Sequence, residues 1–169
     1  MNRKGFTLIE LVMVLVVIGI MAGVVIPRLG NMRTTNASSF ADKLRVDIRY
    51  AQNLAMTRGK RTRVDFTASS YTVSQDTSAA GNCSTMTTVT DPAGSAALSV
   101  ALNAGSYAGI TIGPSMACLE YDSIGKPYVC GAVGGPCSTA LGGMTITVIA
   151  NGATTVDTVT VWAQTGAVN

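Results

Sequence analysis

The sequence predicts an α+β protein in which one long N-terminal helix, its first half apolar enough to span a membrane, packs on a C-terminal antiparallel β-sheet domain. Three observations predict this fold class. Residues 6–26 are apolar with one exception, an amphipathic pattern follows as far as Gly59, and the remainder alternates over short segments rich in Thr, Ser, Ala and Gly. We therefore divide the chain into a leader (1–5), a transmembrane helix (6–27), its amphipathic continuation (28–59) and a β-rich domain (60–169).

The apolar run predicts a membrane span that carries one misplaced charge. A helix from Phe6 to Ile26 would be about 31 Å long, which is enough to cross a bilayer core. Glu10 lies near its start, and a carboxylate inside a span costs on the order of 3 kcal/mol unless it lies near the interface or finds a partner. A secretory signal cleaved after "MAG" at 21–23 and a plain single-pass anchor are two alternatives, and neither explains Glu10.

The stretch "KGFTLIE" resembles the cleavage and recognition motif of type IV prepilins and type II secretion pseudopilins. In that family a prepilin peptidase cuts after the glycine and methylates the new N-terminus. The resemblance implies that Gly5 ends the leader and that Phe6 becomes the methylated N-terminus. It also matches Glu10 to the family's glutamate and Pro27 to a proline found in many members.

For assembly, the resemblance implies a charge pair between Glu10 and the new amine at Phe6. Within one helix the two groups lie about 6 Å apart along the axis. In a bundle of staggered helices, Glu10 of an arriving subunit can pair with the amine of its neighbour. Lipid favours this pairing because it solvates neither charge well. The carboxylate would then set the register of polymerisation, provided that the leader is removed.

The next segment predicts a helix with one buried face. Apolar residues recur at spacings of four and three, and Gly59 is expected to end the helix. Gly23, Pro27 and Gly30 separate this segment from the membrane span. We expect a kink or a locally extended segment there, because proline removes a backbone hydrogen bond and glycine lowers helix propensity. The apolar stripe consists of Phe40, Leu44, Ile48, Ala51 and Ala55.

Short strands and turns are expected beyond residue 60. Alternation around "TASS" predicts a first hairpin, "DSIGKP" a turn between two strands, and "NG" a turn between the last two strands. Residues 76–96 show little periodicity and are expected to form a loop. Further strands are expected at 98–102 and 109–113.

Four cysteines follow the export-type N-terminus, which predicts two disulfides outside the cytoplasm. None of them forms a C-x-x-C pair, so zinc-binding and thioredoxin-type roles are weakly supported. Of the three pairings that four cysteines allow, we prefer Cys83 with Cys118 and Cys130 with Cys137. The second pair would close a short loop rich in Gly and Pro.

The composition argues against catalysis and nucleic-acid binding. The chain has no histidine and no paired nucleophile and base, so no enzyme activity, metal site or cofactor is expected. The net charge of +3 includes two cations of the leader, which leaves no basic field for phosphates. We interpret the one basic cluster as a solvated turn at a helix end, and at most as a weak basic patch; it consists of Lys60, Arg61 and Arg63.

Three later segments resemble the FimT/FimU and GspH group of minor pilins and minor pseudopilins: "AQNLAMTRGKRTRVDF", "LEYDSIGKP" and a last strand that runs into "TG" at Thr165 and Gly166. The resemblance implies a non-enzymatic structural subunit, anchored in the inner membrane with its globular domain in the periplasm. It would then join an extracellular type IV pilus or a periplasmic type II secretion pseudopilus, at or near the tip. The implied partners are other pilin or pseudopilin subunits, prepilin peptidase and membrane lipid.

Two alternatives come from other functional classes. The first is a DNA-binding competence pilin, and the second is a membrane-anchored, exported β-rich adhesin or enzyme. Some FimT-like pilins are thought to bind DNA through arginines just after the C-terminal glycine. Here Gly166 is followed by Ala167, Val168 and Asn169, so nucleic acid is not an expected partner. The sequence does not choose between pilus and secretion system, or between bulk and tip subunit.

Overall fold

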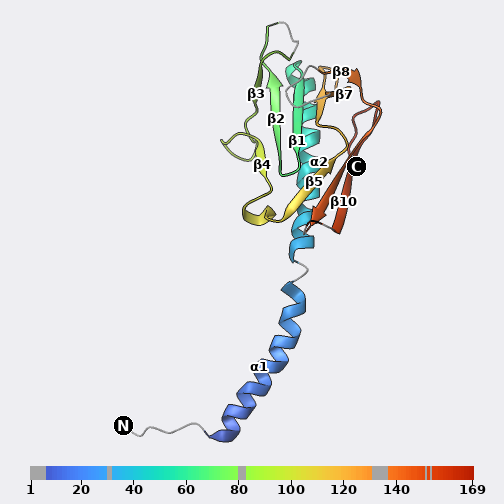
Figure 1. Ribbon diagram of the computed structural model, residues 1–169. Helices are drawn as coiled ribbons and strands as arrows, with labels where there is room; N and C mark the ends of the chain where they lie inside the picture. Colours follow the sequence, from blue (N-terminus) through green and yellow to red (C-terminus); the bar gives the residue numbers. More distant parts are fainter. Residues whose placement is uncertain (1–6, 30–31, 80–82, 131–136, 151, 153) are drawn as a thin grey trace.

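The computed structural model divides into a helical stalk and a mixed body (Figure 1). The stalk is α1 (Leu8–Leu29), and the body begins with α2 (Met32–Arg58). Figure 1 shows α1 extending away from the body, whereas most of α2 runs along the body. The residues described are 7–29, 32–79, 83–130, 137–150, 152 and 154–169, with the side chains of 24–29, 32, 137–139 and 154 left out.

The strands of the body form two antiparallel sheets. The larger has the order β3-β2-β1-β6-β7-β8, with β4 paired to the other end of β2, and the smaller has the order β10-β9-β5. A 3-10 turn, η1 (Gly105–Tyr107), precedes β5. The strands are β1 (Thr62–Thr67), β2 (Ser70–Asp76), β3 (Met86–Thr88), β4 (Ser99–Ala101), β5 (Ile110–Pro114), β6 (Cys118–Tyr121), β7 (Pro127–Cys130), β8 (Cys137–Ala140), β9 (Met144–Ala150) and β10 (Thr154–Val161).

The stalk exposes its apolar side chains on every side. All described side chains of α1 are exposed, and Leu8 and Leu11 retain 80% and 57% of their accessible surface. Within the described residues, which leave out the side chains of 24–29, no helix meets both the length and the hydropathy of a membrane span. The helix continues through Gly23 and Pro27 to Leu29. Gly30, the third residue of the expected kink, lies outside the described residues.

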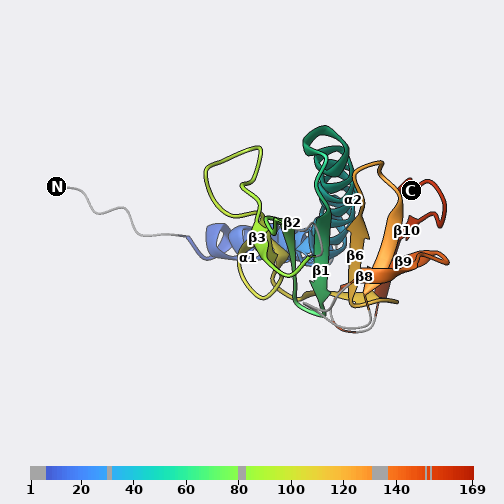
Figure 2. The same cartoon turned by 90° about the horizontal axis from the view of Figure 1, so that it is seen from above.

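The apolar stripe of α2 is buried, as the sequence predicts, and it packs on both sheets. Its five members are completely buried, and α2 contacts strands of both sheets. Seen from above, α2 covers one side of the strands (Figure 2). Gly59, with φ +63°, follows the last helical residue in the left-handed conformation that commonly ends a helix. The predicted helix end is therefore confirmed.

Alternation along the strands supplies the opposite side of the core. The first hairpin forms where "TASS" predicts it and sets Val64 opposite Val73 and Phe66 opposite Tyr71. All four side chains are buried, because residues two apart in a strand face the same side. The strands expected at 98–102 and 109–113 are also present, as β4 and β5. The sequence missed β3, which lies in the expected loop at 76–96, and β8.

A buried polar contact fixes α2 against β2. The hydroxyl of Tyr71 donates to Asp47 Oδ2 at 2.5 Å, and Lys43 Nζ donates to the same oxygen at 2.9 Å. Burial, together with the charge of Asp47, raises the pKa of Tyr71 far above its usual value. The phenol therefore stays a hydrogen-bond donor, which a buried carboxylate requires as a partner.

Candidate functional site

The motif residue Glu10 lies in the first turn of α1. Its backbone N–H donates to Thr7 O at 3.1 Å and is 3.4 Å from Thr7 Oγ1. Thr7 therefore caps the helix, and the spacing T-x-x-E is that of a capping box. A carboxylate is favourable at this positive end of the helix dipole. Glu10 is exposed, and the ion pairs among the described residues do not include it. Gly5 and Phe6 lie outside the described residues.

A second site brings the three later segments together, and we call it the Gln52 junction. Gln52 Nε2 donates to Gly125 O at 2.9 Å and to Thr165 O at 2.8 Å. The hydroxyl of Tyr121 donates to Gly166 O at 3.0 Å. The amide of one helical side chain thus holds the β6–β7 turn beside the C-terminal turn. The sequence shows only that three separate segments resemble one group of pilins. The fold shows that these segments meet.

Close packing at the junction requires glycine at two positions. Gly166 has φ +66°, and a Cβ placed there would lie 2.5 Å from Tyr121 Cε1 and 2.9 Å from Gln52 Nε2. Gly125 has φ +83°, and its Cβ would lie 2.8 Å from the sulfur of Met56. Both residues combine a left-handed backbone with a close approach that a side chain would block.

The rest of the C-terminal segment is also held against the body. Arg49 Nη2 donates to Val168 O at 2.7 Å. Val168 is buried and bridges Val161 of β10, and Asn169 exchanges backbone hydrogen bonds with Thr160. The residues after "TG" therefore pair with β10 and α2.

Two of the three clustered cations belong to a buried ion-pair network, so interpreting the cluster as a solvated turn was wrong for Arg63. Arg63 lies opposite Glu120 on neighbouring strands, and its Nη2 is 3.2 Å from Glu120 Oε2. The two side chains are 1% and 0% exposed. Arg61 Nη1 approaches Glu120 Oε1 at 2.9 Å, and this hydrogen bond is the main reason that the pKa of Arg61 is raised. Lys60 remains exposed.

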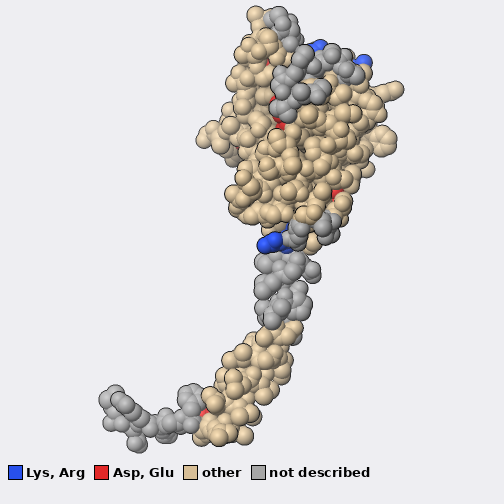
Figure 3. Space-filling model, in the orientation of Figure 1, with Lys and Arg blue, Asp and Glu red and all other residues tan. Residues whose placement is uncertain are grey.

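These contacts leave little of the weak basic patch for a phosphate. Arg61 also lies 5.5 Å from the ring of Tyr128, and Lys126 lies 5.6 Å from the same ring. Cation–π contacts of this length are attractive, and at exposed sites each contributes about 0.5–1 kcal/mol. Figure 3 shows a face of the body with few charged side chains, and the blue surfaces on it are small.

The preferred cysteine pairing was wrong. Cys118 is bonded to Cys130, with a Cα–Cα distance of 5.5 Å. The reason is strand register: β6 and β7 form a hairpin that sets these two residues directly opposite each other. The sequence segment "CLEYDSIGKPYVC" held this signal, because a symmetric strand–turn–strand pattern places its two ends side by side. Cys137 lies opposite Cys130 on β8, and its side chain lies outside the described residues.

Cys83 is a buried free thiol beside the carboxylate of Glu120. Its Sγ lies 3.2 Å and 3.3 Å from the two oxygens of Glu120, and its backbone has φ +61°. Burial, followed by the hydrogen bond to Glu120, raises the pKa of Cys83 to about 11. The thiol therefore acts as a third donor to the carboxylate that binds Arg61 and Arg63. Among the described residues, no group of three or more metal-binding side chains is assembled.

Comparison with known proteins supports both the motif and the fold. A family model described as the prokaryotic N-terminal methylation motif matches residues 1–26. No curated protein matches the sequence significantly. A crystal structure of the type IV minor pilin FimU of Pseudomonas aeruginosa (strain PAO1) superimposes with a TM-score of 0.50 and 15% identity, covering 80% of this chain and 87% of FimU. A second crystal form of FimU gives 0.48 and 13%, covering 78% and 90%.

At this level of identity the likeness to FimU shows the fold alone. The shared fold is an N-terminal helix packed on antiparallel sheets. The motif and the fold are independent observations, because the motif covers residues 1–26 and the whole body lies beyond it. Together they confirm the resemblance and the fold class that the sequence predicts.

Proposed function

We propose that this chain, which combines the N-terminal methylation motif and the fold of type IV pilins, is a minor subunit of a type IV filament. Prepilin peptidase removes residues 1–5 and methylates Phe6. The processed chain is anchored in the inner membrane by α1, with the body on the periplasmic side. It then enters a type IV pilus or a type II secretion pseudopilus at or near the tip. Its role is structural and not catalytic.

The stalk is the observation that carries this proposal. Its apolar side chains are exposed all round, and the core of the body is complete without them, since it is built from residues of α2 and the strands. So large an exposed apolar surface is unfavourable in water, so another apolar surface or medium must cover it. Lipid before assembly and the stalks of other subunits after assembly both supply such a cover.

The DNA-binding alternative receives no support from the contacts described above. Arg61 and Arg63 are directed at Glu120, and the residues after Gly166 include no cation. Non-specific DNA affinity depends on cations that are free to contact phosphates. The adhesin or enzyme alternative likewise lacks a site in the described residues that favours it over a filament subunit.

Processing is tested by mass spectrometry of the protein extracted from the membrane of its host. The expected N-terminus is an N-methylated Phe6, because the resemblance of "KGFTLIE" to the prepilin motif implies cleavage after Gly5. An intact Met1, or a chain that starts after Gly23, would contradict the proposed processing.

Assembly is tested by Glu10→Ala. Membrane anchoring and processing should survive, because an apolar residue enters lipid more easily than a carboxylate. Incorporation into filaments should fall, because the charge pair with the neighbouring amine is lost. The measurement is the amount of the subunit in sheared filaments relative to the membrane fraction. Equal incorporation of mutant and wild type in one strain would exclude the register role of Glu10.

A further inference from the structure

The outer edge of the larger sheet is open at β3. This strand ends the sheet order, and no described strand lies beyond it. Thr87 lies opposite Gln75 of β2. Two backbone hydrogen bonds flank this pair, one from Val89 N to Val73 O and one from Thr77 N to Thr85 O. Because ladder bonds alternate along an antiparallel pair, the polar groups of Thr87 face β2, and those of Met86 and Thr88 point outward.

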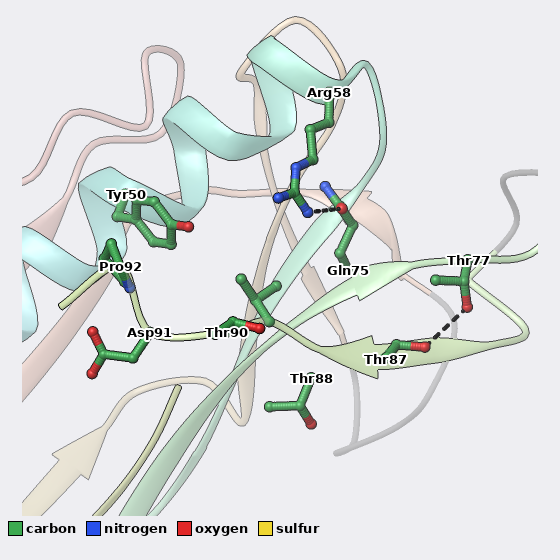
Figure 4. Close-up of a pocket in the computed structure, with 10 residues that line it drawn as sticks. Tyr50, Arg58, Gln75, Thr77, Thr87, Thr88, Thr90, Asp91 and Pro92 are labelled. Atoms are coloured by element: carbon green, nitrogen blue, oxygen red, sulfur yellow. Dashed lines mark hydrogen bonds between the residues drawn. The ribbon is translucent and has the colours of Figure 1, made fainter. Parts of the chain in front are cut away.

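A cleft of about 360 Å³ runs beside this edge, between α2 and the strands β2 and β3. Figure 4 shows its lining, which is polar apart from Val89 and Pro92. Threonine dominates the strand side, where the hydroxyls of Thr77 and Thr87 are 3.1 Å apart. Tyr50 and Arg58 form the helical wall. The volume is within the range of about 300–1,000 Å³ that is typical of ligand sites.

The two charged side chains that line the cleft lie apart from each other (Figure 4). Arg58 Nη1 donates to Gln75 Oε1 at 3.0 Å, and the residue is exposed. Asp91 lines the cleft next to Pro92, and its Oδ1 accepts from Ala93 N at 2.8 Å. A ligand that complements both charges carries an acidic group and a basic group separated along its length.

We propose that β3 and this cleft bind an extended peptide segment of a partner protein by strand addition. The N–H and C=O groups of Met86 and Thr88 pair with the backbone of the peptide, and its alternate side chains enter the cleft. An acidic side chain of the peptide meets Arg58, and a basic side chain farther along meets Asp91. Backbone pairing supplies affinity in this mode of recognition, and the side-chain positions supply specificity. This function is additional to filament assembly and does not depend on it.

The test uses full-length protein in detergent and a fluorescein-labelled nonapeptide, Lys-Thr-Val-Thr-Glu-Thr-Val-Thr-Lys, followed by fluorescence anisotropy. Arg58→Gln should weaken binding about tenfold or more, which corresponds to 1.4 kcal/mol. Thr88→Pro should have at least the same effect, because proline removes the outward N–H but no bond to β2. Thr88→Ala is the matched control, which keeps the amide and should bind within about twofold of wild type.

Hydrogen exchange checks the mode of binding on the same protein. In the free protein, the amides of Met86 and Thr88 should exchange faster than that of Thr87, and saturating peptide should slow both. The proposal is overturned if the peptide does not bind at millimolar concentration, or if Arg58→Gln and Thr88→Pro bind as well as wild type. It is also overturned if a chito-oligosaccharide occupies the cleft and the peptide does not, since the site would then recognise sugars.

Discussion

The two helices of this chain follow one another directly, and the difference between them separates two tasks. Both carry many apolar residues, yet Leu11 of α1 is 57% exposed and Leu44 of α2 is completely buried. In α1 the apolar residues surround the helix, whereas in α2 the buried apolar residues form one stripe and most charged residues lie on the other faces. A helix that is apolar on all sides needs apolar surroundings on all sides. An amphipathic helix can bury its single apolar stripe against a sheet and leave its other faces in water.

This difference implies that folding and assembly depend on separate residues. The core clusters contain no described residue of α1. Substitutions in α2 and the strands should therefore change the stability of the body, and substitutions in α1 should change membrane insertion or subunit contacts. Paired substitutions of the same residue type in the two regions test this separation.

The largest effect on folding is expected from Leu44→Ala, with Leu11→Ala as its control. Removing the buried side chain leaves a cavity between α2 and the strands, which costs about 2–5 kcal/mol of the free energy of unfolding. Leu11→Ala should leave that free energy unchanged within about 0.5 kcal/mol, because its side chain is exposed. Urea unfolding of the detergent-solubilised protein, followed by near-UV circular dichroism, measures both. A similar loss in the two variants would show that stalk and body fold as one unit.

A smaller effect, of about 1–3 kcal/mol, is expected from Gly166→Ala. The new Cβ would lie 2.5 Å from Tyr121 Cε1 at a residue with φ +66°, so both the backbone and the Gln52 junction must shift. The matched control is Gly142→Ala, where a Cβ meets nothing within 4 Å. The midpoint of urea unfolding measures both variants. If they unfold at the same urea concentration, the junction does not hold the C-terminal turn as tightly as its contacts indicate.

The stalk and the body also differ in how far the sequence predicts them. Periodicity predicts the helix of the stalk. In the body it predicts the stripe of α2, the first hairpin and its alternating core, because these depend on near neighbours in the chain. The Gln52 junction joins residues 73 and 113 positions apart, and no local pattern specifies such contacts.

The basic cluster and the cysteines show the same limit. Arg63 is one of three neighbouring cations in the sequence, and its burial depends on the register that sets it opposite Glu120. The short loop between Cys130 and Cys137 suggested a disulfide between these two residues. The register of the β6–β7 hairpin instead pairs Cys118 with Cys130. In both cases, the pairing between strands decides which residues meet. The separation of these residues in the sequence does not reveal that pairing.

The smallest effect is expected from the titration of Cys83, which lies in the body at the same ion-pair network. Burial and the hydrogen bond to Glu120 raise its pKa from 9.0 to about 11, so the folded protein holds this proton more tightly than the unfolded chain. The resulting stability is fully present below pH 9 and is lost as the pH rises through 11. Cys83→Ala lacks the thiol and keeps a Cβ at the same strained backbone position. The difference in unfolding free energy between wild type and Cys83→Ala should therefore shrink between pH 8 and pH 10.5. Because both proteins share every other titrating group, a difference that stays constant over this range would mean that folding does not raise the pKa of Cys83.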